Sequence, residues 1–155
     1  MGKKLIEMLH LQLEPVGIFF GNTTAHSELE AYPRIVFAPL SRWNEVGTPD
    51  LVYIFANADQ ISALVTMQGF HNGKAINTAI PFGAACHSIV YAAEQLKKEE
   101  PMAIMGLFDI SQRSAALKDY LSMTLTYGMW EAMLKDLDKS CLTTHSWRNI
   151  EERLT

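Results

Sequence analysis

The residues Leu51 to Ala56, with the sequence LVYIFA, are the feature that most restricts the fold of this chain. The run holds no charged residue, no glycine and no proline, and β-branched and aromatic side chains predominate in it. A strand with one wet face alternates apolar and polar residues, whereas a continuous apolar run is typical of a strand covered on both faces. The sequence therefore predicts a central strand at this position.

Other segments predict the elements around this strand. Further strands are expected at Val16–Phe20, Arg34–Ala38, Ala75–Ile80, Met102–Phe108 and Tyr120–Tyr127. Helices are expected at Lys3–Leu11, Ala58–Phe70, Ala84–Lys98, Ser111–Asp119 and His145–Leu154, and from Gly128 onward. Asn57 is expected to cap the helix that follows the apolar run, and 42–49 is expected to be a connector. The alternation of apolar and hydroxyl residues in Tyr120–Tyr127 predicts an outer strand with one solvated face.

The order of these elements predicts an α+β (mixed α/β) fold, with a mixed sheet of about five to six strands, helices packed on it and further helices at the C-terminal end. A chain of 155 residues is long enough to bury a core as a single domain, 1–155, without disulfides or a structural metal. The two cysteines, Cys86 and Cys141, show no ligand spacing, and the histidines show none either. No metal site is predicted, and no cofactor is indicated.

Charge and hydropathy exclude two classes of partner. The formal net charge is -4, and lysines and arginines are scattered rather than clustered, which argues against nucleic acid. No apolar run reaches the roughly 18 residues that a membrane-spanning helix needs. The N-terminus reaches Glu7 too early for the apolar core of a signal peptide, so we expect a cytoplasmic protein.

The stretch IPFGAACHSI, Ile80 to Ile89, is the first candidate site, because it joins a predicted strand to a predicted helix. The backbone N–H groups of Gly83, Ala84, Ala85 and Cys86 would then face an anion at the helix start. A thiol in this first turn has its pKa lowered by the helix dipole, which makes Cys86 a candidate nucleophile. No catalytic set accompanies it, because adjacent helix residues such as His87 point about 100° away. Free cysteine is also among the most buried residue types, so Cys86 as a packing residue is the alternative.

Arg113 follows the predicted strand Met102–Phe108 and lies in a polar turn, where its guanidinium can hold a carboxylate or phosphate through two N–H groups. Its alternative is a surface arginine or a partner of Asp109. Thr78 and Tyr127 lie near strand ends that would border the same pocket, although strand hydroxyls are commonly just hydrogen-bonded polar groups. The predicted ligand-binding residues are Thr78, Gly83, Ala84, Ala85, Cys86, Arg113 and Tyr127.

Several short motifs together resemble a known family. They are Leu13–Ile18 (LEPVGI), Phe37–Leu40 (FAPL), Pro49–Ile54 (PDLVYI) with Asn57 and Gln60, Gly83–Cys86 (GAAC) and the turn at Arg113. The chain is similar in these motifs, over residues 13 to about 137, to the domain-of-unknown-function family 169, a prokaryotic family without an assigned biochemical role. Members of that family are typically longer and carry cysteine-containing and glycine-rich stretches where this chain has only Gly21–Pro33. A family function that rests on those cysteines is therefore not expected here.

Two classes of function follow, and a third stays open. The first is a binding module for a small anionic ligand at the Gly83–Cys86 turn, with Arg113 as the cation. The second is an oligomeric structural or partner-binding subunit, with a homo-oligomer expected from apolar stripes near the C-terminus. The third is an enzyme that uses the Cys86 thiol. The residues identify neither the ligand nor a reaction.

Overall fold

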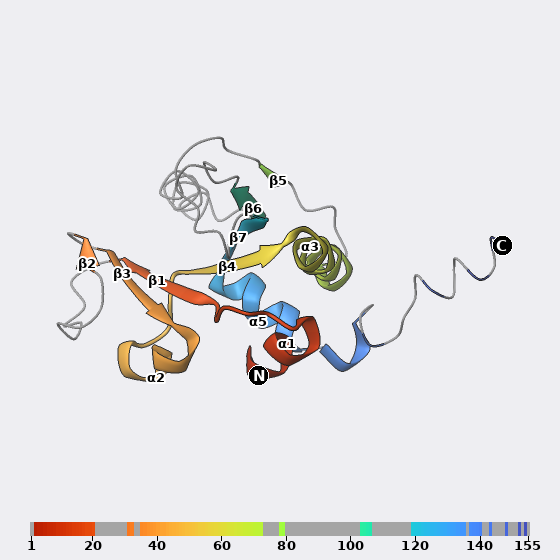
Figure 1. Cartoon of the computed structure of the whole chain (residues 1–155). Coiled ribbons are helices and arrows are strands. Elements are labelled where there is room, and N and C mark those ends of the chain that lie inside the picture. Colours follow the sequence, from red (N-terminus) through yellow and green to blue (C-terminus); the bar gives the residue numbers. More distant parts are fainter. Residues whose placement is uncertain are drawn as a thin grey trace.

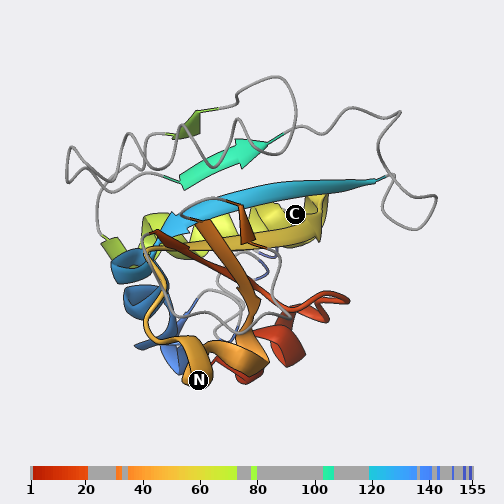
Figure 2. The ribbon, with the colours of Figure 1, turned by 90° about the vertical axis from the view of Figure 1, so that its left-hand side faces the viewer.

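The computed structural model describes residues 2–20, 31–32, 35–72, 78–79, 103–106, 119–135 and 137–140, and four single positions nearer the C-terminus. The described strands form one sheet in the order β2-β3-β1-β4-β7-β6-β5. Their bounds are β1 Val16–Phe20, β2 Ala31–Tyr32, β3 Ile35–Pro39, β4 Leu51–Asn57, β5 Thr78–Ala79, β6 Ala103–Gly106 and β7 Tyr120–Thr126. Figure 2 shows β6 and β5 as successive strands beyond β7.

The expected α+β class is confirmed, but the expected number of strands is not matched. Four antiparallel strands of five to seven residues, β3, β1, β4 and β7, form the main part of the sheet. The four-residue β6 and the two-residue β2 and β5 extend it at both edges to seven strands. The sheet is mixed because β5 runs parallel to β6, while every other described pair is antiparallel.

Strand β4 lies in the middle of the sheet, as its apolar run predicts. Alternate residues point to opposite faces of a strand. Val52, Ile54 and Ala56 belong to one core cluster, and Leu51 and Tyr53 belong to the other. All five side chains are buried, so β4 is covered on both faces.

The described helices pack on one face of the sheet. They are α1 Gly2–Leu9, α2 Trp43–Val46, α3 Ala58–Asn72 and α5 Tyr127–Lys135. Two 3₁₀ turns accompany them: η1 Leu40–Arg42 directly precedes α2, and η4 Leu137–Lys139 follows α5. Each contributes side chains to the core cluster that contains Ile54 and Met123. Figure 1 shows α1 and α5 together below β1 and β4. The larger part of the described core therefore lies between these helices and the sheet.

Strand β7 is not the outer strand that its alternating sequence predicts. It lies inside the sheet, where it pairs with β4 along its whole length and with β6 on its other side. Ser122 and Thr124 are fully buried rather than solvated, opposite Phe55 and Tyr53 of β4. The alternation thus marks a polar stripe on a covered face.

The predicted cap of α3 is confirmed. The Gln60 backbone N–H donates to Asn57 Oδ1 at 2.9 Å, and the Asn57 backbone N–H donates to Gln60 Oε1 at 3.0 Å. This reciprocal pair is a capping box, which satisfies backbone donors at the start of a helix. The Gln60 amide also donates to the carbonyl oxygens of Leu9 and His10, at 2.9 and 3.1 Å. One side chain therefore joins the start of α3 to the end of α1.

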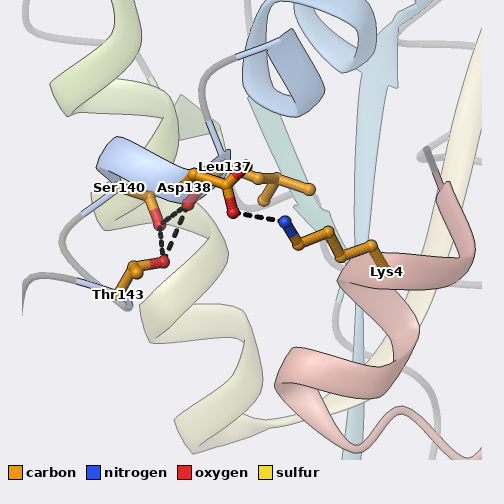
Figure 3. Close-up of polar contacts among 5 residues, drawn as sticks. All are labelled: Lys4, Leu137, Asp138, Ser140 and Thr143. Atoms are coloured by element: carbon orange, nitrogen blue, oxygen red, sulfur yellow. Dashed lines mark hydrogen bonds and ion pairs between the residues drawn. The ribbon is translucent and has the colours of Figure 1, made fainter.

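The N-terminal helix is also joined to η4. Lys4 Nζ forms an ion pair with the Asp138 carboxylate, and Figure 3 shows the two side chains meeting between α1 and η4. In the same view, the hydroxyls of Ser140 and Thr143 both donate to the Leu137 carbonyl, at 2.7 and 2.9 Å. The ion pair is exposed, so it contributes about 0–1 kcal/mol to stability. The hydroxyl contacts close the turn that follows η4.

Some expected elements fall outside the described residues. These are the helix Ala84–Lys98, nearly all of the helix Ser111–Asp119, and the helix His145–Leu154 apart from single helical positions. Of the strands Ala75–Ile80 and Met102–Phe108, the described parts are β5 and β6. In the part of the chain that the structure describes, no helix combines the length and the apolar character needed to cross a bilayer.

Candidate functional site

The structure describes two of the predicted ligand-binding residues. Thr78 is the first residue of β5, and Tyr127 is the first residue of α5 rather than the last residue of a strand. Gly83, Ala84, Ala85, Cys86 and Arg113 lie outside the described residues. In the sheet, β6 and β7 separate Thr78 from β4. The structure therefore neither brings the predicted set together nor separates it.

The pairing of β5 with β6 is the feature that bears on the predicted turn. Thr78 lies opposite Ala103, and Ala79 lies opposite Ile104, in a parallel arrangement. Two adjacent parallel strands need a crossover connection, whereas antiparallel neighbours can be joined by a tight turn. The Gly83–Cys86 stretch follows the carboxyl end of β5 in the chain. Ligands of open α/β sheets bind beyond the carboxyl ends of parallel strands.

Strand β7 places a buried hydroxyl group near this edge of the sheet. Thr124 lies between Tyr53 of β4 and Ile104 of β6. Its hydroxyl is buried, and it has no hydrogen-bond partner among the residues that the structure describes. Burying a hydroxyl without a partner costs about 1–3 kcal/mol in proteins. Thr124 is thus a polar group with unused hydrogen-bonding capacity on the covered sheet face opposite the described helices.

Tyr127 is held at the start of α5 by contacts on three sides. Its backbone N–H donates to the Asp50 carbonyl at 3.3 Å. The Thr126 hydroxyl accepts from the Met129 N–H at 3.2 Å and so caps the helix. The Tyr127 ring meets the Trp43 ring edge to face, with the centroids 6.4 Å apart. The phenol therefore has a fixed position at the surface of the core.

The Tyr127 hydroxyl interacts with Glu131, one helical turn further along α5. Burial, the negative charge of Glu131 and a hydrogen bond to its carboxylate together raise the pKa of Tyr127 above 10.0. The phenol accordingly keeps its proton at neutral pH and donates it in a hydrogen bond to Glu131. A carboxylate beside this hydroxyl repels an anion, so the surroundings of Tyr127 favour a cationic group.

A hollow of about 460 Å³ lies along the same side of α5. Its described lining residues are Tyr127, Trp130, Glu131, Ala132, Leu134 and Lys135. Pockets of 300–1,000 Å³ are typical of small-molecule sites. The sequence analysis missed this hollow, because it predicts only a helix from Gly128 onward and apolar stripes near the C-terminus. The signal present in the sequence is the i, i+4, i+8 series of Tyr127, Glu131 and Lys135, which places three polar groups in a row.

Among the described residues, no group of three or more histidine, cysteine, aspartate or glutamate side chains is placed to hold a metal ion. The polar groups at the α5 hollow are one phenol, one carboxylate and one ammonium group. This set suits the recognition of an organic ligand.

The comparison with family models decides the affiliation of the chain. Residues 22–136 match DUF169, a family described as uncharacterised ArCR. The chain belongs to this family. The DUF169 match covers β2 to β7, the Gly83–Cys86 stretch, Arg113 and the described residues that line the α5 hollow. Comparisons with curated proteins and with solved structures found no similar protein and no similar structure.

The family assignment confirms the resemblance that the short motifs indicate. It also shows that both candidate regions lie within the part of the chain that the family shares. In contrast, α1 and β1 precede the matched residues. The family description carries no activity, so function has to be argued from the residues.

Proposed function

We propose that this DUF169 protein is a binding module for a small anionic molecule, which it holds at the Gly83–Cys86 turn. The observation that carries this proposal is the parallel pairing of β5 with β6. It supports the predicted strand, turn and helix order, because a parallel neighbour requires a crossover after β5. At a helix start in such a crossover, backbone N–H groups and the helix dipole both favour an anion.

The charge needed for selectivity comes from Arg113 in this proposal. The chain as a whole carries a formal charge of -4, so an anion is repelled at long range unless a local cation offsets that field. Arg113 follows β6 in the chain, and β6 is the parallel neighbour of β5. The buried Thr124 hydroxyl on the next strand, β7, offers a further hydrogen bond at this side of the sheet.

The test uses thermal unfolding of the full chain with inorganic phosphate, pyrophosphate and citrate as probes. A ligand that binds only the folded state stabilises it by about 2.7 kcal/mol at a hundred times its Kd, so the Tm rises with ligand concentration. We expect at least one probe to raise the Tm of the wild type and Arg113→Ala to abolish that rise. Arg148→Ala is the matched control, because it removes the same charge from an exposed position. The proposal is wrong if Arg113→Ala and Arg148→Ala respond equally to every probe.

A second candidate function is that of an oligomeric or partner-binding subunit. The observation that favours it is a group of half-buried apolar side chains on the sheet face opposite the described helices: Val16, Phe20, Ile35, Phe37 and Phe55. Apolar patches of this kind commonly mark interfaces. Light scattering over a wide concentration range tests this role, and Phe20→Ser is expected to shift an oligomer towards monomer. A wild type that is monomeric at all concentrations contradicts a homo-oligomer.

A further inference from the structure

We infer that the hollow along α5 is a second binding site, for a small organic amine whose ammonium group pairs with Glu131 and whose hydrocarbon part occupies the hollow. Its charge preference is opposite to that of the proposed anion site. Its described lining residues all belong to one helix, α5. None of these described residues belongs to the Gly83–Cys86 turn.

The charge preference comes from Glu131. Its side chain is exposed at the hollow, and no ion-pair partner for it occurs among the residues that the structure describes. The Glu131 carboxylate interacts with the Tyr127 phenol and, because each of its oxygens carries two lone pairs, it can accept further N–H donors. An ammonium group binding here would form the charge-assisted type of hydrogen bond, which is about twice as strong as a neutral one.

The opposite end of the hollow carries a positive charge. Lys135 lies one helical turn beyond Glu131 and is exposed. Its ammonium group repels a second cation, so the amine binds at the Tyr127 end of the hollow. The row of Tyr127, Glu131 and Lys135 thus sets the orientation of the ligand.

The apolar wall is rigid before a ligand binds. Trp130 is 2% exposed, so it lies behind the hollow rather than forming a broad surface of it, and its ring packs against the Trp43 ring with centroids 5.8 Å apart at an angle of 65°. Trp43 in turn contacts the Tyr127 ring and donates its indole N–H to the Ala38 carbonyl at 2.9 Å. Side chains fixed in this way lose little conformational entropy on binding, which favours affinity for a small ligand.

The experiment follows backbone amide signals of the full chain by two-dimensional NMR during titration with benzylamine. We expect saturable shifts at Tyr127–Lys135, and we expect benzyl alcohol, a neutral analogue of similar shape, to bind more weakly. Glu131→Gln should weaken benzylamine binding about tenfold, the effect of one lost charge-assisted contact. Lys135→Gln should strengthen it, because the repulsion at the far end of the hollow is removed.

Glu7→Gln is the matched control, since it removes one carboxylate from an exposed position on another helix, α1. It should leave the benzylamine affinity unchanged. Glu131 is exposed, so Glu131→Gln is expected to fold normally, and the amide spectrum itself verifies this. The inference is overturned by the absence of saturable shifts in the wild type, by equal affinity for benzylamine and benzyl alcohol, or by equal effects of Glu131→Gln and Glu7→Gln.

Discussion

Gln60 illustrates how a residue that marks a family can be structural. Its backbone and side chain complete the capping box with Asn57, and its amide satisfies the carbonyls of Leu9 and His10. The last carbonyls of a helix have no partner within the helix, so a donor from another element is needed where they are not solvated. Both Asn57 and Gln60 belong to the motifs by which the chain resembles DUF169. Their geometry accounts for them without a catalytic role.

Because Gln60 makes both the capping box and the contacts to Leu9 and His10, we expect Asn57→Ala and Gln60→Ala to lower the free energy of unfolding by different amounts. Asn57→Ala removes one half of the capping box and is expected to lower the free energy of unfolding by about 1 kcal/mol. Gln60→Ala removes the other half and both contacts to α1, so its cost is expected to be about 2–3 kcal/mol. Urea unfolding of both variants measures the difference, provided that the m value is unchanged. Equal costs would show that the contacts to Leu9 and His10 contribute nothing.

Tyr127 and Glu131 predict a measurable change in ionisation. Burial is the largest cause of the raised Tyr127 pKa, followed by the charge of Glu131 and its hydrogen bond. Glu131→Gln is therefore expected to lower the pKa of Tyr127 towards 10.0 without reaching it. Because the folded pKa exceeds the unfolded one, the linked stabilisation is present below pH 10 and is lost as the pH rises through the folded pKa. Carbon-13 NMR titration of the tyrosine ring carbons measures the shift, and an unchanged pKa in the variant would rule out the interaction.

Strand β1 and helix α2 meet at Gly17. A Cβ atom at this position would lie 2.7 Å from Trp43 Nε1 and 3.0 Å from Pro49 Cβ. Trp43 cannot retreat without breaking its hydrogen bond to the Ala38 carbonyl, the residue opposite Gly17 on β3. The short helix α2 is thus fixed on the sheet by close approach of the Trp43 ring to bare backbone.

Gly17→Ala is accordingly expected to destabilise the protein by about 1–3 kcal/mol, the usual cost of overpacking. Gly128→Ala is the matched control on α5, where a Cβ atom meets nothing within 4 Å. This second change should stabilise the protein by about 0.5–1 kcal/mol, because alanine is the better helix former. Thermal and urea unfolding should therefore show a lower stability than the wild type for Gly17→Ala and a higher stability for Gly128→Ala. A Gly17→Ala protein as stable as the wild type would show that Trp43 repacks freely.

The elements that the sequence predicted well are those with a strong local pattern. The LVYIFA run and the Asn57 cap predicted β4 and the start of α3, and both agree with the structure. Helix α2 had no visible pattern, because a single turn has no repeat and depends on the packing of Trp43. Strand β7 was misassigned to the edge, because hydroxyl residues suit either a wet face or a buried polar stripe. Only the pairing of β7 with both β4 and β6 shows that its hydroxyl residues form a buried polar stripe and not a wet face.

The candidate sites differ in what the sequence reveals about them. A glycine-led turn between two predicted elements is visible in the sequence, so the Gly83–Cys86 stretch was found from residue types alone. The α5 hollow was not found, because Trp130 and Leu134 look the same in a sequence whether they fill a core or line a cavity. The sequence analysis likewise does not place Glu131 beside Tyr127. The two residues are neighbours because α5 begins at Tyr127, whereas a strand ending at Tyr127, as expected, would point its side chain away from Glu131.

The sheet as a whole predicts where the most stable part of the described molecule lies. The longest described pairing joins β4 to β7 and runs from Leu51–Thr126 to Asn57–Tyr120. Both strands are interior, and helices α3 and α5 pack against the face that carries Ile54 and Met123. Strand β2 pairs with its neighbour at only two residues. Amide exchange through local opening needs less free energy where fewer buried contacts must break.

We therefore expect hydrogen exchange to be slowest in β4 and β7, at the level of global unfolding, and progressively faster through β1 and β3 to β2. Low concentrations of urea should accelerate exchange at the outer strands first, since their opening exposes less surface than global unfolding does. Substituting Ile54 by alanine is expected to cost about 2–5 kcal/mol, because its fully buried side chain leaves a cavity between β4 and the helices. That loss should speed exchange in β4 and β7 equally. Faster exchange in β4 alone would show that the two strands open separately, and the central pairing would then not be the common core of the sheet.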